Sequence, residues 1–182
     1  MRFDIAQHLC NDNYPAPVRL KWVAWSLCQI FFRFSPTPFH AWRIFLLRCF
    51  GAKIGRGVRI YPSVEVTFPW NLTIADNVVV GRKVQLYALA PIEIGSHVLV
   101  SQGVHLCAGS HDYCRPNLPI AHAPILVKGG TWIAADAFVG PGVTIEPDCV
   151  IGARAVVMRD IPPNSLAAGN PAKVIRGLDS AS

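Results

Sequence analysis

Aliphatic residues recur at every sixth position over the second half of the chain, between positions 127 and 157. The series is Val127, Ile133, Val139, Ile145, Ile151 and Val157, and the fourth residue after each is Thr131, Ala137, Val143, Cys149, Ala155 and Ile161. A helix would place apolar residues three and four apart, and a half-buried strand would alternate them. A period of six instead predicts a solenoid, in which each hexad forms a short strand and a turn and its lead side chain enters a narrow prism.

The same period begins earlier, at Ile54, and is interrupted in places. Its lead positions there are Ile54, Ile60, Val66, Ile74, Val80, Leu86, Ile94, Val100 and Leu106. Three hexads make one triangular coil, so about five coils are expected, over residues 54–71, 74–91, 94–111, 127–144 and 145–162. The pattern therefore predicts an all-β fold, a parallel β-helix over 51–162. The tail, 163–182, has no hexads and is expected to pack over the open end as a cap.

Residues 1–50 follow a different pattern. Residues 1–17 are predicted to form a polar arm, and two short amphipathic helices are expected at about 19–34 and 38–50, separated by prolines. Gly51 would end the second helix. The longest uncharged apolar run there, from Trp22 to Phe32, has 11 residues, whereas a bilayer-spanning helix needs roughly 20. This segment is therefore not expected to span a membrane.

Length and composition indicate a single domain, and the cysteine pattern indicates a reducing compartment. A chain of 182 residues, 52% of them hydrophobic, can bury a core. The six cysteines form no CxxC pair, which favours reduced thiols in a cytoplasmic protein. The N-terminus lacks the cationic segment and apolar run of a signal peptide.

The net charge of +6 is concentrated in one segment. No acidic residue occurs between Asp12 and Glu65, whereas that stretch holds eight basic ones. The segment is rich in Trp and Phe and matches no groove-reading motif, so nucleic acid is not an expected partner. Arginines among aromatic residues instead indicate contact of residues 18–50 with an anionic membrane surface, at its inner face. The alternative is a helical cap that only shields the first coil.

A loop at 107–126 interrupts the solenoid and contains the sequence GSHDYCRPNLPIAHAP. A long loop in a strict repeat costs entropy and adds no core, and such loops are usually functional.

Several motifs narrow the family. They are GAKIG (51–55), PWNL (69–72), SQGVHLCAGSHDY (101–113), PILV (124–127), TWIAADAFVGPGV (131–143) and GNPAKVI (169–175). Together with the IGxxVx hexads, they resemble the hexapeptide-repeat acyltransferases, in the branch of colanic-acid and exopolysaccharide O-acetyltransferases. The resemblance covers residues 51–177 and implies a left-handed parallel β-helix. It also implies a homotrimer, because the cofactor groove of such enzymes lies between two prisms.

The resemblance implies an acetyl-CoA-dependent O-acetyltransferase acting on a sugar hydroxyl of an exopolysaccharide or its lipid-linked precursor. Its general base would be His111, since an imidazole titrates near neutral pH and can take the hydroxyl proton. Asp112 would orient that imidazole. Transfer would be direct, with no acyl-enzyme and no metal.

Family correspondence also gives the donor site. Trp132 would lie beside the pantetheine arm, Ala135 and Ala153 would offer backbone groups, and Lys173 and Arg176 would bind the 3′-phosphate. Two positions depart from the family pattern, Ala134 where relatives have Gly and Met158 where they have Thr. On the acceptor side, position alone suggests Tyr87, Ser101 and Gln102.

Other functions remain open from the sequence. The acceptor could be an amino sugar, an antibiotic or serine, because a histidine base serves all of them. The prism could be a scaffold without catalysis. Related β-helix carbonic anhydrases bind zinc through three histidines, and His105, His111 and His122 could be mistaken for such a set. Their spacing and the GSHD context of His111 argue against it. Among the other histidines, His105 is expected to face outward, His97 lies beside a turn, and His122 lies in the loop between alanines.

Overall fold

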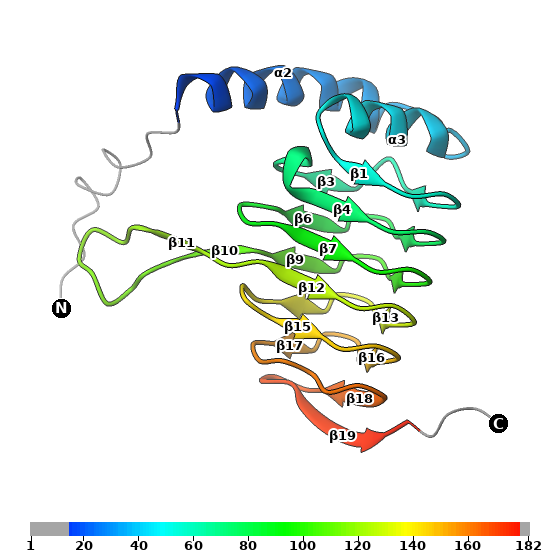
Figure 1. Ribbon diagram of the computed structural model, residues 1–182, viewed down its shortest axis with the longest axis vertical. Helices are drawn as coiled ribbons and strands as arrows, with labels where there is room; N and C mark the ends of the chain where they lie inside the picture. The colour runs from blue at the N-terminus through cyan, green and yellow to red at the C-terminus, as the bar shows by residue number, and fades with distance from the viewer. Residues whose placement is uncertain (1–14, 179–182) are drawn as a thin grey trace.

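The hexads form short strands stacked into a three-sided prism, as the period of six predicts (Figure 1). The structure, a computed structural model, describes residues 15–178. Most of the predicted arm, 1–17, and the last four residues therefore lie outside the described part. Every predicted lead residue is buried, with an exposed fraction of at most 8%. The parallel pairing of successive coils in register places each lead side chain on top of the next.

Three sheets make the sides of the prism. Sheet A contains β1 (Lys53–Ile54), β4 (Leu72–Ile74), β7 (Ile92–Ile94), β12 (Ile125–Val127) and β15 (Thr144–Ile145). Sheet B contains β2 (Arg59–Ile60), β5 (Val79–Val80), β8 (Leu99–Val100), β13 (Trp132–Ile133), β16 (Val150–Ile151), β18 (Ser165–Ala168) and β19 (Lys173–Gly177). Sheet C contains β3 (Glu65–Val66), β6 (Gln85–Tyr87), β9 (His105–Cys107), β14 (Phe138–Val139) and β17 (Val156–Val157). A short 3₁₀ helix, η1 (Pro69–Asn71), precedes β4.

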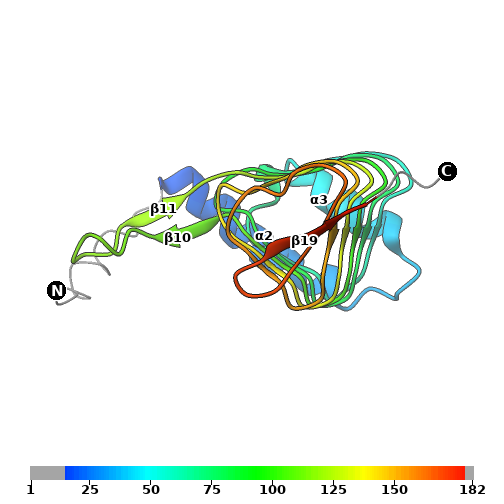
Figure 2. The same ribbon diagram turned by 90° about the horizontal axis from the view of Figure 1, so that it is seen from below.

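The solenoid continues into a sixth, partial coil, one more than the approximately five expected, and strand β18 of this coil lies within the predicted cap, 163–182. Ile161 pairs with Ile145 in the coil above, and Ala167 pairs with Ile151. The coil between Ile145 and Ile161 is therefore two residues shorter than three hexads, which moves the next lead position out of phase. The small residue Ala167 then fills a lead position. After this coil, β19 turns back antiparallel to β18 and crosses the end of the prism (Figure 2).

Two helices cover the first coil, α2 (Ala16–Arg33) and α3 (His40–Cys49). The predicted bounds were off by up to three residues at each end. Helix α2 begins earlier because Pro17 lies in its first turn, where the missing N–H has no helical partner to lose. Helix α3 ends one residue before Phe50, and Gly51 follows with φ of +97°, the left-handed conformation that terminates helices.

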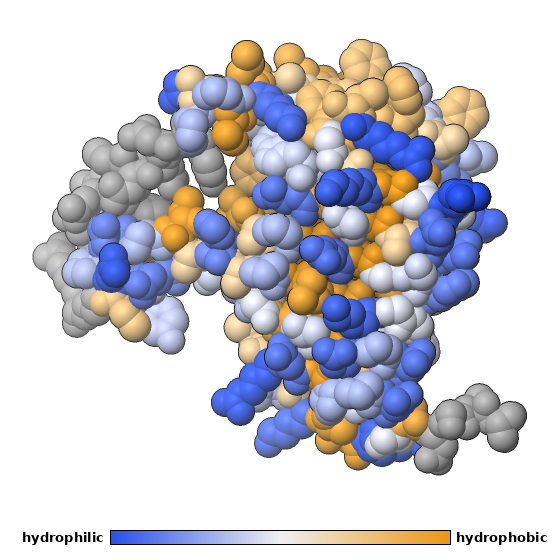
Figure 3. All heavy atoms as spheres, viewed as in Figure 1, coloured by the Kyte–Doolittle hydropathy of each residue, from blue (hydrophilic) through white to orange (hydrophobic). Residues whose placement is uncertain are grey.

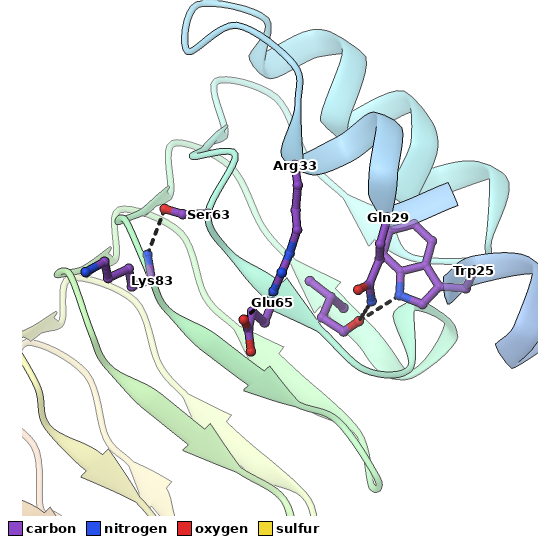
Figure 4. A network of polar contacts seen from close by, with 7 residues as sticks. Trp25, Gln29, Arg33, Ser63, Glu65 and Lys83 are labelled. Carbon is purple, nitrogen blue, oxygen red and sulfur yellow. Dashed lines mark hydrogen bonds and ion pairs between the residues drawn. The ribbon is translucent and has the colours of Figure 1, made fainter. Parts of the chain in front are cut away.

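The helices complete the hydrogen bonds of the exposed edge. In the second coil, the carbonyls of Ile74, Val80 and Leu86 accept N–H groups of the first coil. The equivalent carbonyls of the first coil have no coil above them, and helix side chains donate to them instead. Arg48 donates to Ile54, and Arg43 Nε donates to Ile60 at 2.6 Å. Trp25 Nε1 and Gln29 Nε2 both donate to Val66, at 2.7 and 2.9 Å (Figure 4). Each lead carbonyl at the edge is thereby satisfied.

Arg43 is the most unusual member of this cap, since its side chain is fully buried without a carboxylate among its described contacts. Besides Ile60, its guanidinium donates to Ser35 Oγ at 2.7 Å and to the carbonyls of Pro36 and Thr37 at 2.9 and 2.5 Å. Burial lowers the pKa of Arg43 from its ordinary value. The guanidinium thus ties the α2–α3 connection to the edge of sheet B, as charged donors with several acceptors can.

Candidate functional site

The loop that interrupts the solenoid is a hairpin that projects away from the prism (Figures 1 and 2). It is made of β10 (Gly109–His111) and β11 (Ile120–His122), antiparallel, with His111 opposite Ile120. It leaves the prism after β9 of sheet C and returns into β12 of sheet A. A side chain at Gly109 would collide with Leu89, so glycine lets the first strand of the hairpin pass close to the coil above.

His111 has a ring position fixed by the hairpin. Its Nδ1 atom lies 2.9 Å from the carbonyl oxygen of Leu118, across the turn. A carbonyl only accepts, so Nδ1 carries the hydrogen, and in the neutral ring Nε2 then carries the lone pair. This tautomer leaves a proton acceptor at Nε2, which is what a general base requires.

The contacts described for Asp112 lie in the turn of the hairpin. Its Oδ1 atom accepts the N–H of Cys114 at 3.0 Å, and its Oδ2 atom lies 3.3 Å from Nε of Arg115. Its own N–H donates to the carbonyl of Pro119. These contacts suit a residue that shapes the turn. The predicted role in orienting the imidazole of His111 stays a prediction.

Tyr87 lies near the base of the hairpin, opposite Cys107 in the register of sheet C. It lines a groove of about 530 Å³ between helix α2 and the first coils. The groove is lined by Arg19, Trp22, Val23, Thr67, Phe68, Tyr87 and Leu89. The sequence did not predict that Arg19 and Trp22 line this groove. The hexad pattern carries no information on the direction in which α2 crosses the prism.

Trp132 and Ser101 are neighbours on sheet B. The indole Nε1–H donates to Ser101 Oγ at 2.9 Å, and the indole is 46% exposed. Gln102 follows Ser101 in the turn that leads toward sheet C, and its carbonyl accepts the N–H of Asp136 in the coil below. Ala135 and Ala153 lie in the two next turns of this same corner, where the carbonyl of Ala135 accepts the N–H of Arg154. Five predicted site residues are thus stacked on one side of the prism.

Lys173 and Arg176 lie on β19, at the end of the prism farthest from the helices. Both side chains are exposed. Lys173 pairs with Ala168 and Arg176 with Leu166 in the antiparallel register. Two exposed cations on one strand are suited to a phosphate.

Apart from Lys173 and Arg176 on β19, the predicted residues therefore form two groups in a single chain. His111, Asp112 and Tyr87 belong to the corner between sheets C and A, whereas Ser101, Gln102, Trp132, Ala135 and Ala153 belong to sheet B and its corner with sheet C. Within one chain, the hairpin projects from a different corner of the prism from the one that carries the second group (Figure 2).

The remaining histidines were predicted to have no catalytic role. His105 is half-buried on the outside of sheet C, edge-on to the rings of Tyr87 and Phe138. Within residues 15–178, no group of three or more His, Cys, Asp and Glu side chains is placed to hold a metal ion.

Comparisons with known proteins agree with this architecture. No protein-family model matches the chain. The chain is 47% identical over 152 residues to the Escherichia coli protein WcaF, named as a colanic acid biosynthesis acetyltransferase, and the match covers 84% of each chain. It is 32% identical over 131 residues to galactoside O-acetyltransferase of E. coli, covering 70% of this chain and 64% of that one.

Two solved structures share the fold. One is a hexapeptide-repeat acetyltransferase from Vibrio cholerae in complex with acetyl coenzyme A, with a TM-score of 0.84 and 27% identity over 93% of each chain. The other is a galactoside acetyltransferase in complex with coenzyme A, with a TM-score of 0.84 and 26% identity over 92% of this chain and 85% of that one. The chain belongs to the hexapeptide-repeat acetyltransferases, and among them it is WcaF-like.

Proposed function

We propose that the protein transfers an acetyl group from acetyl-CoA to a sugar hydroxyl of an exopolysaccharide or of its lipid-linked precursor. The observation that carries the proposal is the hairpin at the break of the solenoid, with His111 held through Nδ1 so that Nε2 can accept a proton. The similarity to WcaF supports the sugar acceptor. The solved relatives with acetyl coenzyme A and coenzyme A support the donor.

The transfer proceeds in one ternary complex. Nε2 of His111 takes the proton of the sugar hydroxyl as its oxygen attacks the thioester carbonyl. The C–O bond forms, and a backbone N–H stabilises the tetrahedral oxyanion. The C–S bond then breaks, and the imidazolium returns its proton to the departing thiolate. Neither an acyl-enzyme nor a metal is part of this scheme.

The donor would lie along sheet B and its corner with sheet C. There, Trp132 would flank the pantetheine arm, and its hydrogen bond to Ser101 limits the rotation of the indole. Ala135 and Ala153 would offer backbone groups from stacked turns. Lys173 and Arg176 would bind the 3′-phosphate, since β19 presents both cations to solvent. On the acceptor side we retain Tyr87, beside the hairpin, and Gln102 with Ser101.

The active unit would be a homotrimer. The base and the donor group of residues belong to different corners of one prism, so a site that contains both is most simply completed by a neighbouring subunit. His111 of one subunit would then act on acetyl-CoA held against Trp132 of the next. We propose that this chemistry takes place in the cytoplasm, which the cysteine pattern and the use of acetyl-CoA support. A lipid-linked acceptor would bring it to the inner face of the membrane.

The test is release of CoA thiol across a panel of mono- and oligosaccharides. His111→Ala should lower the rate at least about a hundredfold, because the general base is lost. His122→Ala is the matched control, a second exposed histidine in the same hairpin that should retain activity. If His111→Ala releases thiol as fast as the wild type in the presence of an acceptor, His111 is not the base. If no saccharide promotes thiol release, the sugar acceptor is wrong.

A further inference from the structure

Helix α2 has an apolar face on the side that points away from the prism. Its buried residues are Trp25 and Phe32. The exposed ones recur three and four positions apart with exposed fractions of 50 to 85%: Leu20, Val23, Leu27, Ile30, Phe31 and Phe34. On a helix these two series lie on opposite sides. The outer face of a surface helix is normally charged, so an apolar outer face calls for a partner.

The connection to α3 extends this surface. Phe39, Trp42 and Phe45 are 41 to 56% exposed, and the rings of Trp42 and Phe45 stack with centroids 5.9 Å apart. A hollow of about 600 Å³ lies where the helices meet. We call these nine residues of α2, the connection and α3 the helical apolar face. Figure 3 shows hydrophobic residues gathered over this end of the molecule.

Basic residues are concentrated at the same end of the molecule as the helical apolar face. Residues 13–64 contain eight basic residues and no acidic one. Of these, Arg43 is buried and Arg33 is paired with Glu65 of the first coil. The other six are exposed on the helices and the first coil: Arg19, Lys21, Arg48, Lys53, Arg56 and Arg59. We call these six residues the cationic rim. An apolar surface with cations at the same end of the molecule complements a partner that is apolar inside and anionic at its surface.

No helix among residues 15–178 is long and apolar enough to cross a bilayer. We propose that the helical apolar face docks in the plane of an anionic phospholipid bilayer. Its aromatic and aliphatic side chains enter the boundary between headgroups and acyl chains, and the cationic rim contacts the lipid phosphates. A second copy of the chain is a poorer partner, because two such faces would bring two cationic rims together.

Docking in this orientation would bring the proposed active site close to a lipid-linked acceptor. The biological role of docking therefore rests on the proposed function. Trp22 and Val23 of α2 line the groove that also contains Tyr87, at the corner that carries the hairpin. An acceptor anchored in the bilayer would therefore reach the predicted acceptor side along α2. The prism extends from the helical end toward β19, so the predicted phosphate-binding cations lie at the end away from the lipid (Figure 1).

The direct test is co-sedimentation of the full-length protein with vesicles of phosphatidylcholine containing about one third phosphatidylglycerol. Binding is expected at low salt and should weaken in pure phosphatidylcholine and as salt is raised. The variant Leu27→Gln, Phe31→Gln, Phe34→Gln changes side chains 62, 65 and 85% exposed, so the fold should tolerate it. Its partitioning onto the vesicles should fall at least about tenfold.

The matched control changes three exposed apolar side chains far from the helices: Met158→Gln, Val174→Gln, Ile175→Gln. It should bind vesicles like the wild type. The proposal is overturned if the wild type does not sediment with anionic vesicles, or if the helical variant binds as well as the control. It is also overturned if the helical variant changes the oligomeric state without lipid, since the face is then an interface between protein chains.

The same measurements separate this proposal from the catalytic one. His111→Ala should lose acetyl transfer and keep vesicle binding. The helical variant should lose vesicle binding and keep transfer to a water-soluble saccharide, because none of its three positions is assigned to the site.

Discussion

His105 is a histidine held between two aromatic rings on the outside of sheet C. Its ring centroid lies 5.3 Å from that of Phe138 and 6.4 Å from that of Tyr87, both edge-on. Burial lowers the pKa of His105 from its ordinary value of 6.5. Below about pH 6.5, the imidazole of His105 therefore binds a proton more readily in the unfolded chain than in the folded one. The neutral ring contributes stability above about pH 6.5, and this contribution is lost as the pH falls.

We therefore expect the urea midpoint of the wild type to fall as the pH is lowered from about 7 to about 5. His105→Gln should fall less steeply over the same range, because the glutamine has no proton to bind. The measurement is a series of unfolding curves for both proteins at matched ionic strength. Parallel slopes for the two proteins would show that His105 does not contribute to the pH dependence.

At the scale of elements, two side chains of helix α2 donate hydrogen bonds to a single carbonyl of the edge strand β3. The carbonyl of Val66 accepts from both Trp25 and Gln29 (Figure 4). The indole of Trp25 is 1% exposed and also packs on Phe32 and Phe50. Removal of one donor leaves the carbonyl paired. Removal of both leaves a buried acceptor without a partner.

The losses of unfolding free energy on removing the two donors should consequently be non-additive. Gln29→Leu should cost about 1 kcal/mol of unfolding free energy, the usual net value of one hydrogen bond. Trp25→Phe should cost more, because the smaller ring also leaves part of a buried site unfilled. The double variant should cost about 1 to 2 kcal/mol more than the sum of the single changes, since only then is the carbonyl unpaired. Denaturant unfolding of the four proteins of this cycle measures the coupling. Simple additivity would mean that water replaces the lost donors.

The repeat was predictable element by element, because every lead position carries a side chain that must be buried. The lead residues from Ile54 to Val157 all lie in the core. The sixth coil was not predictable in this way. It begins two residues out of phase, at Ile161, and its next lead position is only an alanine. The positions of α2 and α3 on the prism depend on contacts between distant residues, such as Trp25 with Val66, and local periodicity carries no such information.

At the scale of the whole molecule, the separation of His111 from Trp132 bears on the assembly. The sequence supplied both residues as candidates, together with the loop that carries His111. It did not show that they belong to different corners of one prism, because that follows from the order in which three sheets alternate along the chain. The groove along α2 that contains Tyr87 was likewise missed, since it joins residues of the helix to residues of the first coils.

If each site takes His111 from one subunit and Trp132 from another, inactive variants should complement each other. Co-expression of His111→Ala and Trp132→Ala chains with different tags should give mixed oligomers in which some sites contain both native residues. The purified mixed oligomers should release thiol faster than either parent oligomer. Equal rates in mixed and parent oligomers would indicate that each site is built within one chain.

The helix donors at the first coil also set where the stack of coils stops. A second solenoid could stack on the first coil only if its N–H groups bonded to the carbonyls of Ile54, Ile60 and Val66 at this edge. Because Arg48, Arg43, Trp25 and Gln29 already occupy these carbonyls, a second solenoid has no acceptors to join here. The helical cap thereby prevents end-to-end stacking of molecules into a filament at this edge.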